Sequence, residues 1–66
     1  MSIGANLKRL RTDRAMSQTE LAERVHVTQS MIAQIERGTK AMSLPLGMEI
    51  ADALECDVQE FTKGIP

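Results

Sequence analysis

A row of uncharged polar side chains recurs on one face of a helical pattern that runs from Thr28 to Arg37. Helical periodicity turns Ile32 and Ile35 to one side and leaves the other side to Gln29, Ser30, Ala33, Gln34 and Arg37. An amide can bond adenine through two hydrogen bonds, a small side chain allows close approach or touches a thymine methyl, and a guanidinium can hold phosphate. The row contains no carboxylate, and it predicts contacts with base edges of duplex DNA by Thr28, Gln29, Ser30, Ala33 and Gln34. An uncharged solvent-facing surface is the alternative.

Two short helical patterns, separated by only a few residues, lie within residues 17–38. Ser17 can begin the first, because its hydroxyl can accept a hydrogen bond from the N–H of Glu20 while the Glu20 carboxylate returns one to Ser17. Such a cap stabilises a helix by about 0.5–2 kcal/mol. This helix is expected to end near Val25, and the second to begin at Thr28 and stop at Gly38. The pattern predicts a helix-turn-helix.

Three further helices are expected around this pair. Apolar residues recur at helical spacing over residues 2–15, which predicts a first helix. A fourth is expected to begin at Ser43, since Pro45 fits the first turn of a helix, where its missing N–H would have had no partner. A fifth, of about two turns, is expected from a reciprocal cap between Asp57 and Glu60. The sequence therefore predicts one all-α, compact five-helix domain over residues 1–66.

Composition sets limits on this domain. The chain has 66 residues, of which 42% are hydrophobic and 26% charged, an ordinary balance for a small globular protein. No stretch is apolar for long enough to span a bilayer, and no signal peptide or lipidation motif is recognisable. We therefore expect no membrane partner and a cytoplasmic location.

Residue types suited to catalysis or metal binding are few. Cys56 is the one cysteine, so no internal disulfide can form, and its apolar neighbourhood predicts a small buried side chain. His26 has no Ser, Asp or Cys partner at a recognisable catalytic spacing, which indicates a turn residue. The four glycines are too scattered for a phosphate-binding loop. Enzymatic activity, a cofactor and a metal are all unexpected.

The net charge of −1 conceals an uneven distribution. Residues 1–40 carry seven basic and four acidic side chains, a balance of +3, whereas residues 41–66 carry one basic and five acidic side chains, a balance of −4. One end of the molecule is therefore predicted to meet phosphate and the other to face away from it.

The helix-turn-helix segment resembles the Cro/C1-type family of phage repressors and bacterial regulators, also called the xenobiotic-response-element type. The resemblance extends from about Leu7 to Phe61 and is carried by Gln18, Leu21, Ala22, Val25, Val27, Ile32, Ile35, Glu36 and Gly38. One departure lies in the turn, where His26 replaces the usual glycine. If that position takes a positive φ, histidine costs on the order of 1 kcal/mol relative to glycine.

This resemblance implies a lambda-repressor-like domain, with the helix-turn-helix at its second and third helices, in a prokaryotic or phage-encoded regulator. The expected function is repression by a homodimer on a pseudo-palindromic operator. Arg11 and Glu36 are expected to form a structural ion pair, and Leu54, Val58 and Ile65 to meet a two-fold partner. Phosphate contacts are expected from Gln18, Arg37, Thr39 and Lys40.

Two other functions compete with repression. An activator or restriction-modification controller shares the expected fold, and Glu20 and Glu23 could present an acidic patch to RNA polymerase. An antitoxin-like interaction module could bind a protein partner through the acidic carboxy-terminal half. An RNA or single-strand binder is disfavoured, because Phe61 is the only aromatic residue and bases would have no stacking platform.

Overall fold

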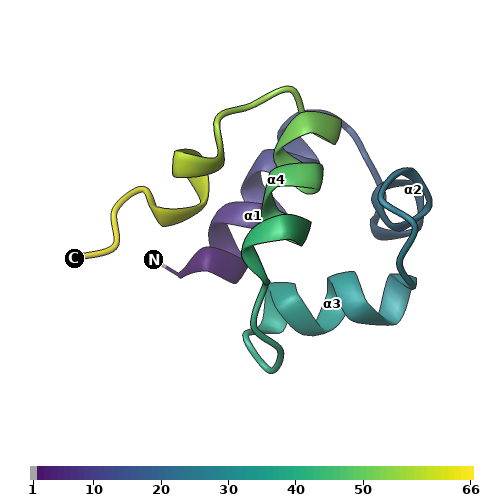
Figure 1. Cartoon of the computed structure of the whole chain (residues 1–66), viewed down its shortest axis with the longest axis horizontal. Helices are drawn as coiled ribbons and strands as arrows, with labels where there is room; N and C mark the ends of the chain where they lie inside the picture. The colour runs from purple at the N-terminus through teal and green to yellow at the C-terminus, as the bar shows by residue number, and fades with distance from the viewer. Residues whose placement is uncertain (1) are drawn as a thin grey trace.

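A computed structural model describes residues 2–66, and it is built from helices alone over that range (Figure 1). The elements are α1 (Ile3–Asp13), α2 (Gln18–Arg24), α3 (Gln29–Arg37), α4 (Leu44–Ala53) and the 3₁₀ helix η1 (Val58–Thr62). The predicted all-α fold is confirmed, with the fifth element a tight 3₁₀ turn. None of the helices in residues 2–66 has the length and apolar character needed to cross a membrane.

Each α-helix begins at a hydroxyl side chain that accepts a hydrogen bond from the N–H three residues later. The caps are Ser2, Ser17, Thr28 and Ser43, at 3.1, 3.0, 3.1 and 3.3 Å. The reciprocal half of the Ser17 cap does not form, because the Glu20 carboxylate instead lies 3.5 Å from Arg24 one turn later. The bond from the Glu20 N–H to the Ser17 hydroxyl is enough to satisfy an N–H that the helix itself leaves unpaired.

The predicted cap between Asp57 and Glu60 is also wrong in detail. The Asp57 carboxylate accepts from the N–H of Gln59 at 2.9 Å, and the Glu60 N–H donates to the Asp57 backbone carbonyl at 3.0 Å. The Glu60 carboxylate lies 3.7 Å from Lys63. A 3₁₀ helix pairs residues three apart along the backbone, so the N–H that the side chain would have capped already has a partner.

All four α-helices end in the same motif, with one residue at positive φ. These residues are Ala15 (54°), His26 (60°), Gly38 (84°) and Glu55 (54°). In each case the next N–H donates back to a carbonyl of the last helical turn, at 2.9–3.2 Å, and the donors are Met16, Val27, Thr39 and Cys56. The positive φ considered for His26 is therefore confirmed, and only α3 uses glycine for this conformation.

The core is shared by all five elements. α1 packs against α3 and η1, α2 packs against α3 and α4, and α4 contacts η1. The largest fully buried apolar side chains are Leu7, Leu21, Ile32, Ile35, Ile50, Leu54 and Phe61. The assignment of Leu54 to a dimer interface is wrong, because this residue directly follows α4 with its side chain in the core and no exposed surface.

Asn6 is a buried polar residue that the sequence analysis did not single out. Its side-chain amide donates to the carbonyls of Phe61 at 2.8 Å and Lys63 at 3.0 Å, across more than fifty residues of chain. These two bonds fasten η1 and the following tail to α1. The available signal was an asparagine one position before the core residue Leu7, at the start of a helix.

Replacing His26 by glycine is expected to raise the free energy of unfolding by about 0.5–1 kcal/mol. Glycine removes about 1–2 kcal/mol of strain that histidine has in the left-handed conformation of the folded state. Part of this gain is lost, because glycine also increases the conformational entropy of the unfolded chain. Urea unfolding of the His26→Gly protein measures this, and Gly38→Ala, which adds the same strain, should lower stability. An unchanged or reduced stability of His26→Gly would show that the turn is not strained.

Candidate nucleic-acid interface

The exposed face of α3 carries the polar row that the sequence predicts. Gln29, Ser30 and Arg37 are exposed, Gln34 is half-buried, and Ile32 and Ile35 are buried behind them. Figure 1 shows α3 along one edge of the molecule, with α2 beside its first turn. The amides and the hydroxyl are therefore free to meet a partner that approaches this edge.

Ala33 does not belong to the exposed row, and its predicted outward placement is wrong. Only 9% of its surface is accessible. Ala33 lies on the same stripe of α3 as Gln29 and Glu36, at spacings of four and three residues. Gln18 at the start of α2 bonds both of those residues and so covers the stripe between them. A methyl group fits there because α2 and α3 approach closely at this point.

The amides on the exposed face are tethered. Gln29 donates from its side-chain nitrogen to Oε1 of Gln18 at 2.7 Å, and Gln34 donates to the hydroxyl of Ser30 at 3.1 Å. A primary amide has two hydrogens and a carbonyl oxygen, so one such bond leaves capacity for a base edge. The bonds reduce the side-chain freedom that binding would otherwise remove.

A buried ion pair connects Gln29 to the first helix. Arg11 Nε lies 2.6 Å from Glu36 Oε2 and Arg11 Nη2 lies 3.0 Å from Glu36 Oε1, a bidentate geometry, with 9% and 4% of the two side chains accessible. Gln18 donates to the same Oε1 at 2.9 Å, and Arg11 Nη1 donates to the Met16 carbonyl at 2.7 Å. An unbroken chain of bonds therefore runs from α1 through Glu36 and Gln18 to Gln29.

Both members of the pair stay charged. Burial acts to raise the pKa of Glu36, but the hydrogen bonds from Arg11 and Gln18 and the charges of Arg11 and Lys8 outweigh it and hold the pKa below its ordinary value. The hydrogen bond to Glu36 raises the pKa of Arg11 against the opposing effect of burial. The anchor is thus an arginine–carboxylate pair at neutral pH.

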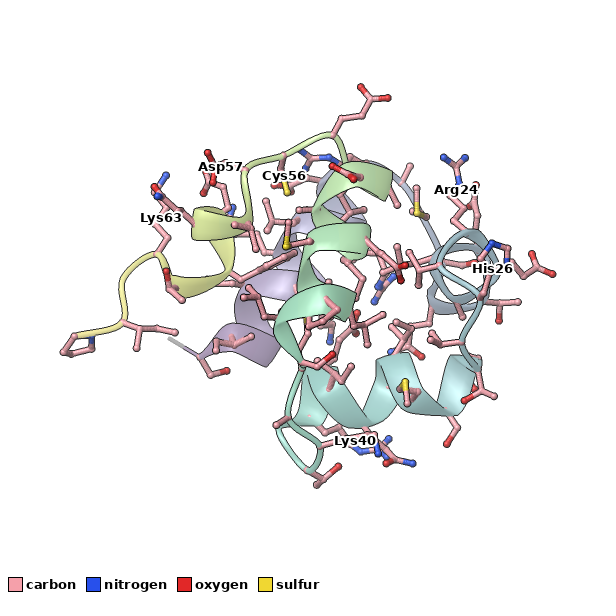
Figure 2. The ribbon with its side chains drawn as sticks, viewed as in Figure 1. Arg24, His26, Lys40, Cys56, Asp57 and Lys63 are labelled. Atoms are coloured by element: carbon pink, nitrogen blue, oxygen red, sulfur yellow. The ribbon has the colours of Figure 1, made fainter. Side chains whose placement is uncertain are left out.

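The residues assigned to phosphate lie at two ends of the interface. Arg37, Thr39 and Lys40 are exposed at the end of α3 and in the loop after it, and Figure 2 shows Lys40 beneath that end. Thr39 is fixed by two bonds to the Gln34 carbonyl, from its N–H at 3.0 Å and its hydroxyl at 3.2 Å. Gln18 stands at the start of α2, half-buried and already bonded to Glu36 and Gln29.

The charge separation predicted from the sequence is present only in part. Lys40 lies at the α3 edge of the molecule, whereas Asp57 lies on the far side, beyond α4 (Figure 2). The exposed acidic residues of the second half are Glu49, Asp52, Glu55 and Asp57. A polyanion that approaches the α3 edge meets the exposed Arg37 and Lys40. Basic residues also occur outside this edge, since Lys63 lies beside Asp57 (Figure 2) and Arg24 lines a groove with Glu49 and Asp52.

A family model described as "Helix-turn-helix" matches residues 7–61 of the chain. This range contains α2, α3 and every residue of the interface. A comparison with curated protein sequences gives no match.

Solved structures with the same fold include three regulators. The restriction-modification controller protein C.AhdI from Aeromonas hydrophila is 32% identical, with a TM-score of 0.86, over 89% of this chain and 86% of that one. The clp gene regulator ClgR from C. glutamicum is 29% identical, with a TM-score of 0.86, over 97% and 88%. The P22 c2 repressor, in complex with a synthetic operator, is 23% identical, with a TM-score of 0.88, over 97% of both chains.

Replacing Glu36 by glutamine is expected to lower the free energy of unfolding by about 3 kcal/mol at pH 7, because Arg11 would keep its buried charge without a countercharge. Since folding lowers the pKa of Glu36, the wild-type advantage should be complete above the unfolded carboxyl pKa of about 4.3 and disappear as the pH falls through the folded value. Urea unfolding of both proteins between neutral and acidic pH measures the difference.

The matched control is Glu20→Gln, which removes an exposed carboxylate paired with Arg24. That change should cost less than about 0.5 kcal/mol at neutral pH. Equal losses for the two variants would contradict the view that Glu36 is a buried anchor.

Proposed function

The chain belongs to the helix-turn-helix family and is a DNA-binding transcription regulator, and we propose that it represses transcription as a homodimer bound to a two-fold operator. The observation that carries this proposal is the exposed, carboxylate-free face of α3, held in place by the bonds from Gln29 through Gln18 to Glu36. Occupying a promoter is the simplest way for such a protein to act.

In this proposal α3 enters the major groove of duplex DNA. Gln29, Ser30 and Gln34 contact base edges, and Thr28 makes a closer contact at the start of the helix. The Thr28 hydroxyl accepts from the N–H of Met31 at 3.1 Å, and its hydrogen remains able to donate. The methyl contact expected of Ala33 is left out because that side chain is buried.

Phosphates on either side of the groove are held by the two ends of the interface. Arg37, Thr39 and Lys40 bind the backbone beyond the last turn of α3, where all three are exposed. A phosphate on the other side of the groove is bound by Gln18 and by the free N–H groups at the start of α2. Gln18 donates to it the side-chain amide hydrogen that is not bonded to Glu36. These contacts fix the position of α3 without selecting sequence.

The two-fold partner covers apolar surface beside the loop that follows α3. Leu54 cannot contribute, but Val58 and Ile65 are half-buried, and Leu44 at 69% and Met48 at 54% exposure are among the most exposed large apolar residues. Ile3, Leu44 and Val58 line one shallow groove, and Ile3 and Ile65 line its neighbour. A second copy packed here would set two α3 helices in successive major grooves, about 34 Å apart.

A second candidate is a restriction-modification controller, which the 32% identity to C.AhdI favours. If the chain activates transcription in this way, the exposed Glu20 and Glu23 on α2 would face RNA polymerase. Both candidates bind duplex DNA through the same face, so they differ in operator position and not in the chemistry of α3.

Selection from a random pool of duplexes tests the proposal. We expect enrichment of a site with two related halves separated by about ten base pairs, together with dimers in sedimentation at the concentrations used. Enrichment of a single half-site would contradict the homodimer. Absence of any enrichment over nonspecific binding would favour an interaction module instead, and reporter transcription from the selected site separates repression from activation.

Truncating Gln34 and Lys40 to alanine should have different effects. Gln34→Ala should relax base preference at one position in each half-site, at about 1–3 kcal/mol, because a base-specific contact is lost. Lys40→Ala should weaken binding to all sequences alike and reduce the salt slope by about one per protomer. Binding titrations on selected and scrambled duplexes at several salt concentrations measure both. Gln59→Ala and Lys63→Ala, which remove the same groups from the η1 side, serve as controls.

A further inference from the structure

We propose that Gly4 is a positioning residue for DNA binding: it lets α1 rest directly on the backbone of the last turn of α3 and so fixes the loop that carries the phosphate contacts. The inference rests on the proposed assignment of Arg37, Thr39 and Lys40 to phosphate. Gly4 itself is buried and has no side chain of its own to contact DNA.

The contact between Gly4 and α3 leaves no room for a side chain. A Cβ atom at this position would lie 2.4 Å from the Ile35 carbonyl oxygen and 2.5 Å from the Glu36 carbonyl oxygen. Both obstacles are backbone atoms of a helix, which cannot move aside as the tip of a flexible side chain can. Any residue other than glycine must therefore push α1 and the end of α3 apart.

The obstructing carbonyls belong to the turn that ends α3. The Ile35 carbonyl accepts the Gly38 N–H at 3.1 Å, and the preceding carbonyl, of Gln34, accepts the Thr39 N–H at 3.0 Å. These two bonds define the direction in which the chain leaves the helix. Displacing the Ile35 carbonyl would thus reorient Thr39 and Lys40.

Gly4 also completes a two-point attachment of α3 to α1. Gly4 and Arg11 are seven residues apart on one face of α1, with the fully buried Leu7 between them. Arg11 holds the Glu36 side chain, while Gly4 meets the Glu36 backbone. With a single attachment, α3 could rotate about Glu36. The second attachment also fixes the distance between the last turn of α3 and α1.

Gly47 provides a matched comparison within the same chain. It is also a buried helical glycine, in α4, but a Cβ there would lie 3.5 Å from the side chain of Met42, an ordinary contact. Gly47→Ala therefore tests the general effect of alanine in a helix, and Gly4→Ala tests the effect of separating α1 from α3.

The experiment compares the wild-type chain, Gly4→Ala and Gly47→Ala on the selected duplex, in a salt titration at a temperature where thermal unfolding shows all three to be folded. We expect Gly4→Ala to lose affinity and to lower the salt slope by up to about two per protomer, since Arg37 and Lys40 would no longer reach phosphate together. Gly47 lines the groove proposed for the two-fold partner, so sedimentation first establishes that Gly47→Ala remains a dimer. The dimeric Gly47→Ala protein should keep the wild-type slope. Because Gly4→Ala is destabilised by its clash, it is also measured with Glu55→Gly, which relieves a positive φ remote from α3.

A folded Gly4→Ala protein with the wild-type salt slope would overturn the inference. So would failure of Gly4→Ala to fold with Glu55→Gly present, because Gly4 would then be needed for the whole fold and not for the placement of the loop. Failure of the proposed function is distinguishable, since in that case the wild-type chain itself would show no selective binding to any duplex.

Discussion

The bidentate pair between Arg11 and Glu36 is the interaction on which the interface depends. It joins α1 to α3 where both side chains are almost entirely buried, so each charge is tolerated only in the presence of the other. Gln18 bonds the same carboxylate and passes the constraint to Gln29 on the exposed face. A rigid amide loses less freedom on binding than a mobile one, so an interaction in the interior of the domain prepares the surface of α3.

Helix endings supply the remaining constraint on how α2 and α3 are arranged. Each α-helix stops at a residue with positive φ, and three of the four residues are not glycine. The carbonyl bonds that follow return Met16, Val27 and Cys56 to the core, so apolar contacts compensate for the local strain. A chain this small has only a small hydrophobic core. Such helix endings keep the connections short, so that α2 and α3 can pack closely.

Overall charge is a poor guide to what this molecule binds. The net charge of −1 would suggest no polyanionic partner, yet Arg37 and Lys40 are exposed at the end of α3, and Asp57 lies far from Lys40 (Figure 2). A local group of basic residues can attract a polyanion even where the whole chain is slightly acidic. The same arrangement serves a repressor or a controller.

The sequence by itself determined the helices and the exposed polar row of α3, because caps, stop signals and helical periodicity are local properties of neighbouring residues. It also indicated, through family resemblance, the pairing of Arg11 with Glu36. Tertiary structure alone decided that Ala33 and Leu54 are covered, that Gln18 bonds Gln29, that Asn6 fastens the tail and that Gly4 touches the end of α3. Each of these depends on the distance between elements far apart along the chain, which periodicity within one helix cannot supply.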